Sequence, residues 1–255
     1  MPPLSSPAVL LRRIDHGDYD LILTFFTPFR GRLSAMAKAA KKSTRRFSGV
    51  LELFSALDIV CSHGRGRGLP ILQEATLKEG FAGIRGDLLR TAYASYWCQL
   101  IADWSEEGQP VEPLYRLLLH CLKRLDEAKR QPASISMLFQ IRFLGIAGLA
   151  PNLSACRKCG RAAKDLDDTR FFFDMAGGDL HCQSCCPATG NPVLLSKGTV
   201  LQMQWAQAGT LGRADRIRFS PQAVKEGTRL LEAFLPFHLG KEPRSLRFLR
   251  QIRGD

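Results

Sequence analysis

The chain has 255 residues, of which 45% are hydrophobic, and it carries 36 Lys and Arg against 24 Asp and Glu. The resulting net charge of +12 indicates an acidic partner, such as nucleic acid or anionic lipid. No apolar run approaches the roughly 20 residues that a membrane-spanning helix needs, and the first residues lack the basic-then-apolar order of a secretory signal. We therefore expect a cytoplasmic protein whose thiols stay reduced, which disfavours disulfides.

The first 80 residues alternate between apolar and polar side chains, which is the pattern of β-strands. Polar segments that contain Gly separate the alternating stretches and are typical of turns. Five strands are expected, near residues 8–13, 20–26, 31–39, 50–60 and 70–78. Five short strands with such turns suit a small closed barrel better than an open sheet.

The segment from Leu21 to Leu51 holds seven Lys or Arg and no Asp or Glu. A continuous positive track follows a phosphate backbone, and the release of counterions supplies affinity without sequence preference. The alternative, a solvated face, usually mixes both signs of charge. Phe47 is the expected platform for a stacked base. The expected nucleic-acid contacts are Arg30, Arg32, Lys38, Lys41, Lys42, Arg45, Arg46 and Phe47. The "GRGRG" stretch at 64–68 is expected to be a loop that lies beside the phosphate backbone of the nucleic acid.

After Gly86 the apolar spacing becomes that of a helix, with one broad stripe from Leu88 to Trp104. Later helices are expected over about 114–129, 134–148, from 196 onward, 220–234 and 243–252, with Ser134, Ser196 and Ser220 as N-caps. The sequence therefore predicts an α+β protein, with a barrel domain at residues 1–80 and a helical domain at 81–255. A cysteine-rich insertion is expected at about 152–187.

The insertion contains the pattern Cys156-x2-Cys159, then 22 residues, then Cys182-x2-Cys185. Two C-x2-C knuckles at this separation are typical of a four-thiolate zinc site. Four thiolates close the coordination shell, so the metal supports structure and does not activate water. The stretch between the knuckles is expected to form a hairpin that turns at Gly177-Gly178 and brings the two pairs together.

Other interpretations of the cysteines stay open. Cys186 forms a C-x3-C pair with Cys182 and can replace Cys185 as the fourth ligand, and His181 can substitute in principle. A redox C-x-x-C of the thioredoxin type would need a preceding βαβ pattern, which the sequence lacks. Cys61, Cys98 and Cys121 lie on apolar faces and are interpreted as buried small hydrophobes.

A catalytic set is not evident. The chain has no H-E-x-x-H, G-x-S-x-G or Walker-type loop. His16 lies close to Asp15, Asp18 and Asp20, but the cluster is in a Gly-containing turn, where such residues usually shape the turn. We therefore expect a binding protein and not an enzyme.

Three stretches together resemble the RecO family of bacterial DNA repair proteins. They are the "GDYDLILTFFTPFRGRLSAMAKAAKKSTRRFSGVLELFSALDI" segment near the start, the C-x2-C pairs, and "FLPFHLGKEPRSLRFLRQI" near the end. The resemblance spans nearly the whole chain, and it implies an N-terminal OB-fold barrel followed by a helical domain that bears the zinc module. By position, the seven cations from Arg30 to Arg46 become the DNA track of the OB-fold.

The resemblance also implies a function. Members of the family are recombination mediators that bind single- and double-stranded DNA and anneal strands coated by single-strand-binding protein. Together with RecR they help to load RecA. The acidic tail of single-strand-binding protein is expected to contact the helical domain, with Lys123 and Arg124 as candidates, and the protein is expected near the nucleoid. The alternative function is that of a zinc-containing RNA- or ribosome-associated binding protein.

Overall fold

The computed structural model describes residues 3–43, 45–62, 68–127, 129–186, 192–214 and 216–254. Most of the expected "GRGRG" loop lies outside these ranges. The chain divides into two compact units, one formed by residues 1–129 together with 243–255 and the other by residues 130–242. Within the described ranges, no helix is both long and apolar enough to cross a membrane.

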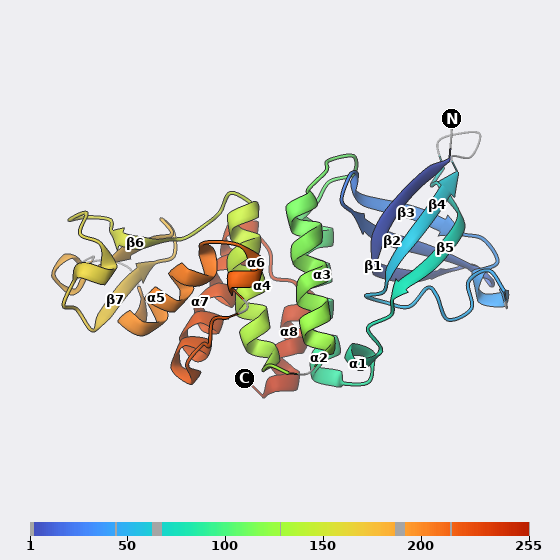
Figure 1. Cartoon of the computed structure of the whole chain (residues 1–255). Helices are drawn as coiled ribbons and strands as arrows, with labels where there is room; N and C mark the ends of the chain where they lie inside the picture. The colour runs from blue at the N-terminus through green and yellow to red at the C-terminus, as the bar shows by residue number, and fades with distance from the viewer. Residues whose placement is uncertain are drawn as a thin grey trace. The chain divides into compact units, whose positions relative to one another are not determined.

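The first unit contains a closed five-stranded barrel, which confirms the expected barrel (Figure 1). Its strands are β1 (Leu4–His16), β2 (Asp20–Thr27), β3 (Gly31–Ala37), β4 (Ala56–Ser62) and β5 (Ile71–Glu79). Around the barrel the strand order is β1-β2-β3-β5-β4, and β3 meets β5 in a parallel pair. Every second residue of β3 is buried, including Leu33, Ala35 and Ala37, because alternate side chains of a strand point to opposite faces.

The fourth strand differs from the expectation. It begins at Ala56, whereas the alternation predicted a strand over 50–60. Phe54 has a φ of 73°, in the left-handed region, so the chain cannot run as an extended strand through this residue. The segment turns instead, and the N–H of Ser55 donates to the carbonyl of Glu52 at 3.2 Å. The apolar residues before Phe54 therefore cover the barrel core from a loop.

Four helices complete the first unit. They are α1 (Ala82–Arg85), α2 (Leu88–Trp104), α3 (Glu112–Asp126) and α8 (Arg244–Arg253). Asp87 caps α2, because its carboxylate accepts from the N–H of Arg90 at 2.9 Å. At the other end of α2, Gln99 accepts from the N–H of Ser245 at 2.9 Å, so the last helix packs against the first long one. The domain boundary expected between residues 80 and 81 stays a prediction.

The barrel is joined to these helices at Gly31. The N–H of Gly108 donates to the carbonyl of Arg30 at 2.9 Å, and the N–H of Arg32 donates to the carbonyl of Glu106 at 3.2 Å. Gly31 has a φ of 61°, and a Cβ added there would lie 2.3 Å from the carbonyl oxygen of Gln109. Glycine is therefore required both by the backbone conformation and by the close approach of the α2–α3 connection.

The second unit combines helices with a small sheet. Its helices are α4 (Pro132–Ile146), α5 (Lys197–Gln207), α6 (Leu211–Ala214) and α7 (Pro221–Leu239), and its strands are β6 (Asn152–Cys156), β7 (Arg170–Asp174), β8 (Asp179–His181) and β9 (Val193–Ser196). The strand order is β6-β8-β7-β9. The caps Ser196 and Ser220 are confirmed, since their hydroxyls accept from the N–H groups of Thr199 and Ala223. Ser134 is not a cap, because α4 starts two residues earlier with Pro132 at its first position.

Candidate nucleic-acid interface and metal centre

Six of the seven expected DNA-contacting cations are exposed on the barrel, and five of them cluster. Arg30 precedes β3, whereas Lys38 follows it. The seven-residue strand between them places the two ends roughly 20 Å or more apart. The cluster at the far end, which we call the basic loop, consists of Lys38, Lys41, Lys42, Arg45 and Arg46.

The basic loop is held against the turn between β1 and β2. The N–H of Ala39 donates to the carboxylate of Asp20 at 2.7 Å, and the N–H of Lys41 donates to the carbonyl of Tyr19 at 3.0 Å. The 3-10 turn η1 (Ala40–Lys42) follows. The ammonium of Lys42 lies 3.3 Å from the centre of the Tyr19 ring, a cation–π contact.

Phe47 is only 4% exposed and belongs to the barrel core. The guanidinium of Arg46 covers its ring, with the central carbon 4.3 Å from the ring centre. A ring buried in this way does not present a face to a base, so base stacking has to be assigned to another residue. Tyr19 is 45% exposed and lies against Lys42, so it is an exposed aromatic ring beside the basic loop, which sequence reasoning did not single out. Its position in the "GDYD" turn, beside the charged segment once the barrel closes, was the available signal.

Arg32 is placed differently from the other six cations. Its guanidinium donates to the carbonyl of Ala102 at 2.7 Å, in the last turn of α2. Carbonyls at a helix C-terminus lack intrahelical partners and carry partial negative charge, so a guanidinium there stabilises the helix end. Arg32 therefore supports the joint between the barrel and α2, and the basic loop is formed without it.

The four cysteines of the two knuckles come together in the second unit. The sulfurs of Cys156, Cys159, Cys182 and Cys185 all lie within 4.8 Å of one another, and those of Cys159 and Cys182 are 3.9 Å apart. In a tetrahedral zinc site with Zn–S bonds of about 2.3 Å, neighbouring sulfurs lie about 3.8 Å apart. Neither Cys186 nor His181 is part of the group. The donor set and its spacing therefore fit a four-thiolate metal site.

The hairpin between the knuckles is confirmed. Strands β7 and β8 pair antiparallel, with Phe172 opposite His181, and residues 175–178 form the turn. The turn is therefore longer than the two glycines expected, and the carboxylate of Asp174 accepts from the N–H groups of Ala176 and Gly177. The N–H of Arg157 donates to the carbonyl of Leu180 at 2.7 Å, which brings the first knuckle to the strand that leads into the second.

Backbone N–H groups point at the sulfurs. Burial by itself would raise the pKa of the Cys156 thiol, but the N–H groups of Cys159, Cys182 and Lys158 together lower it. The N–H of Cys182 lies 3.4 Å from the sulfur of Cys156. Hydrogen bonds from the backbone N–H of Arg161, and next from its side chain, lower the pKa of Cys159 to about 6. Such hydrogen bonds stabilise thiolates, which are the form that binds a metal.

The thiols of the second knuckle have raised pKa values. Burial raises the pKa of Cys182, and a hydrogen bond with Cys182 raises the pKa of Cys185 to about 12. Four thiols so close together cannot all ionise without a compensating positive charge. The cluster as a whole is therefore suited to a bound cation.

Four cysteines lie outside this cluster, and all of them except Cys186 are buried. Cys61, Cys98 and Cys121 are each at most 2% exposed, which confirms that they pack as small hydrophobes. Burial raises the pKa of Cys61 to about 11 and also raises that of Cys98, so both thiols stay protonated at neutral pH.

Comparisons with known proteins give consistent matches along the chain. Residues 1–81 match the family model described as Recombination protein O N terminal, and residues 85–247 match that described as Recombination protein O C terminal. A relative from Desulfatibacillum aliphaticivorans is 46% identical over 256 residues, which cover 99% of this chain and 98% of the relative. A relative from Desulfosudis oleivorans is 40% identical over 258 residues, which cover 99% of each chain. A third, from Pelobacter propionicus, is 36% identical over 260 residues, and all three are named DNA repair protein RecO.

Proposed function

Because the chain belongs to the RecO family and has a role in DNA repair and recombination, we propose that it is a mediator that anneals complementary single strands of DNA. On strands coated by single-strand-binding protein it also helps to load the recombinase RecA, acting together with RecR. The observation that carries this proposal is the exposed basic loop at one end of the barrel.

The proposed mechanism is electrostatic. Cations of the basic loop neutralise backbone phosphates, and the counterions released from the DNA supply affinity for any sequence. Two strands bound to the same protein repel each other less, and their effective concentration rises. Tyr19, held by Lys42 and partly exposed, is the ring on which a base can stack. No step needs a catalytic group, so the mediator is proposed to act without enzymatic activity.

Single-strand-binding protein is proposed to recruit the mediator through its acidic tail. Lys123 and Arg124 lie in the last turn of α3. The carboxylates of Glu79 and Glu127 lie 3.9 Å and 3.0 Å from them, so an acidic peptide would have to displace these partners. The site of action is proposed to be the cytoplasm, at the nucleoid.

Cys156, Cys159, Cys182 and Cys185 are proposed to hold one structural Zn²⁺. The ion would supply a fixed positive charge that compensates four thiolates and leaves no coordination position for water. The chain's own part is to place the sulfurs, through the turn after β6 and the short η3 turn (Gln183–Cys185), and to aim backbone N–H groups at them. Bound there, the ion would cross-link a sheet whose strands are only three to five residues long.

A strand-annealing assay tests the central proposal. Complementary oligonucleotides coated with single-strand-binding protein are mixed with the protein in the absence of ATP, and duplex formation is followed by fluorescence. We expect faster pairing, because charge neutralisation and tethering need no nucleotide hydrolysis. An unchanged pairing rate would exclude annealing. A preference for folded RNA over single-stranded DNA in a competition experiment would favour the RNA-binding alternative.

Removal of the loop charges should weaken DNA binding generally. In a variant with Lys41, Lys42, Arg45 and Arg46 replaced by Ala, we expect weaker binding to all sequences alike. We also expect affinity to depend less steeply on salt. The slope of log K against log[salt] should become shallower by about 0.7 for every phosphate of a single strand that the variant no longer binds. Fluorescence anisotropy over a salt series measures both quantities.

The matched control changes the same number of charges in the second unit. Its replacements to Ala are at the exposed residues Arg213, Arg216, Arg218 and Lys225. The control should keep most of the affinity and the slope. Equal losses in the two variants would mean that net charge, and not the basic loop, governs DNA binding.

A further inference from the structure

A pocket of about 200 Å³ opens at the end of the barrel, where β1, η1 and the segment before β4 meet. Its lining contains two cations, Arg13 and Lys41, one carboxylate, Glu52, and the hydroxyls of Ser43 and Ser48. The volume is several times the roughly 30 Å³ that a water molecule occupies in the liquid. A phosphate group therefore fits into a pocket whose walls are polar and whose cations outnumber its carboxylate.

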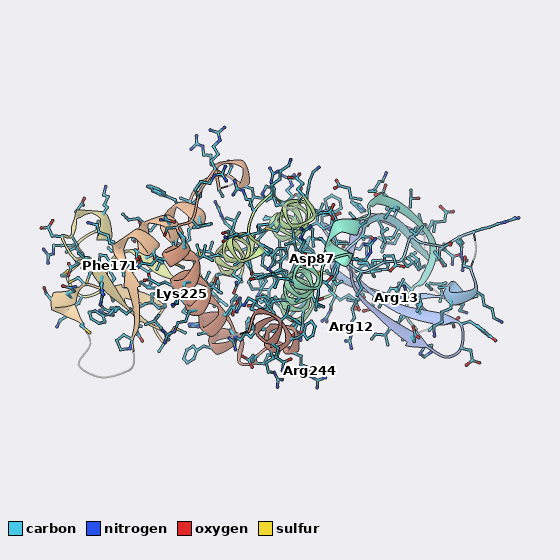
Figure 2. The ribbon with its side chains drawn as sticks, turned by 90° about the horizontal axis from the view of Figure 1, so that it is seen from below. Arg12, Arg13, Asp87, Phe171, Lys225 and Arg244 are labelled. Atoms are coloured by element: carbon cyan, nitrogen blue, oxygen red, sulfur yellow. The ribbon has the colours of Figure 1, made fainter. Side chains whose placement is uncertain are left out.

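The register of β1 explains why Arg13 reaches this pocket. Arg13 is opposite Leu23 on β2, and Asp15 is opposite Leu21, so both share a face with these core leucines. Successive residues of a strand point to opposite faces, so the side chain of the neighbouring Arg12 points away from the pocket. Figure 2 labels the two arginines on the barrel. Arg13 lies before the charged segment 21–51, which is why sequence reasoning did not include it.

Each cation of the pocket is paired with a carboxylate. The ammonium of Lys41 lies 2.9 Å from Asp15, and the guanidinium of Arg13 lies 3.7 Å from Glu52. The Asp15 side chain is 71% exposed and the Glu52 side chain 42%. Ion pairs with such exposure favour the paired state by at most about fivefold. A DNA phosphate held by both cations can therefore displace the two carboxylates.

We propose that this pocket binds one backbone phosphate of DNA between Arg13 and Lys41, and that Asp15 and Glu52 occupy the two cations until the phosphate arrives. This inference rests on the DNA binding proposed above, to which it adds a defined subsite and two competing carboxylates. The carboxylates lower the affinity for a strand without removing any contact from the complex. A lower affinity for the bound strand helps a mediator to release the annealed duplex.

The test measures the binding of a labelled poly-dT oligonucleotide over a salt series. Asp15→Asn and Glu52→Gln are each expected to tighten binding about two- to fivefold, because the competing carboxylate is gone. The salt slope stays the same, since the phosphate contacts in the complex are unchanged. Arg13→Ala is expected to weaken binding and to lower the slope by about 0.7, the value for one phosphate contact on a single strand.

Matched controls separate the pocket from net charge. Asp18→Asn makes the same charge change at an exposed position of the β1–β2 turn, and Arg12→Ala removes the same charge from the opposite face of β1. Both should leave affinity and slope close to those of the unaltered protein. Arg13 also donates to the carbonyl of Leu51 at 3.2 Å, so Arg13→Gln serves as a second variant that keeps a donor and loses the charge. It should behave like Arg13→Ala.

The outcomes distinguish this inference from the proposed function. If the unaltered protein binds DNA but the pocket variants match their controls, the pocket assignment is overturned and DNA binding by the barrel stands. If the unaltered protein shows no salt-dependent binding, both fail. The oligonucleotide is used with and without a 5′-phosphate, and equal effects are expected. An effect confined to the phosphorylated strand would contradict binding of a backbone phosphate.

Discussion

Replacement of Cys156 by Ser is expected to remove zinc from the second unit and to unfold the segment around the four sulfurs. Cys156 is 1% exposed and ends β6, where its sulfur accepts from the N–H of Cys182. Zinc binding at a structural site contributes on the order of 10 kcal/mol. Cys156 ends β6, and the N–H of the next residue, Arg157, donates to the carbonyl of Leu180 in β8, so loss of this ligand should be transmitted to both strands.

The measurements are metal content by elemental analysis, thiol titration and thermal unfolding with and without a chelator. The unaltered protein is expected to hold one zinc with four protected thiols and to lose stability in the chelator. Cys156→Ser should hold no zinc and show no further loss. A Cys156→Ser variant with full metal content would contradict the assignment of Cys156 as a ligand.

Cys186→Ser is the matched control. Its thiol is next to that of Cys185 in the chain but is not part of the four-sulfur group. The variant is therefore expected to keep its zinc and its melting temperature, whereas Cys185→Ser should behave like Cys156→Ser. The reverse result for this pair would assign the fourth ligand to Cys186.

Gly31→Ala is expected to destabilise the first unit by about 2 to 4 kcal/mol. The left-handed φ of 61° costs an Ala roughly 1 kcal/mol. The added Cβ would also lie 2.3 Å and 2.6 Å from the backbone oxygens of Gln109 and Glu106. The Glu106 oxygen accepts from the N–H of Arg32, so it cannot move without weakening the joint. Overpacking of this kind adds a further 1 to 3 kcal/mol, roughly.

Gly17→Ala separates the two costs. Gly17 has a similar φ of 56° in the preceding β-turn, but nothing lies within 4 Å of the position that a Cβ would take. This control should lose only about 1 kcal/mol, the cost of the left-handed conformation. Urea unfolding of both variants, followed by far-UV circular dichroism, measures the difference. Equal losses would show that the connection yields easily and that the barrel is not fixed to α2 at this point.

The joint at Gly31 also bears on function, because it separates two of the expected DNA contacts. Arg30 stays exposed on one side of Gly31, whereas Arg32 on the other side donates to the end of α2. We therefore expect Arg32→Ala to lower the stability of the first unit, whatever its effect on DNA binding. Substitutions in the basic loop test DNA binding without disturbing this joint, because its cations lie at the opposite end of β3.

Local patterns in the sequence were sufficient for much of the fold. Alternation over the first 80 residues predicted the barrel, and the helical spacing after Gly86 predicted α2. The caps Ser196 and Ser220 were evident because a cap acts on residues only three positions away. The spacing of the cysteine pairs predicted the four-sulfur group and the hairpin between them. Each of these features leaves a mark in the local spacing of residues, even where the segments that meet, such as β1 and β4, are far apart in the chain.

Other features depended on how the elements pack, and short-range patterns carry no information about that. Phe47 closely follows four cations in the chain, yet closure of the barrel places it in the core. Arg32 follows the strand alternation, but its partner Ala102 lies 70 residues away. The last helix packs on α2 across an even longer separation.

The sequence alone thus determined the charge of the chain, its period-two and helical patterns and its cysteine spacing. Each of these is a property of the composition or the order of residues. The tertiary structure alone decided which cations are exposed in the basic loop, which one supports the end of a helix, and which are paired with a carboxylate at the pocket beside Arg13. The physical reason is that the partner of a charged side chain is chosen by distance in space. That distance is set by strand register and by the close approach of backbones at glycine.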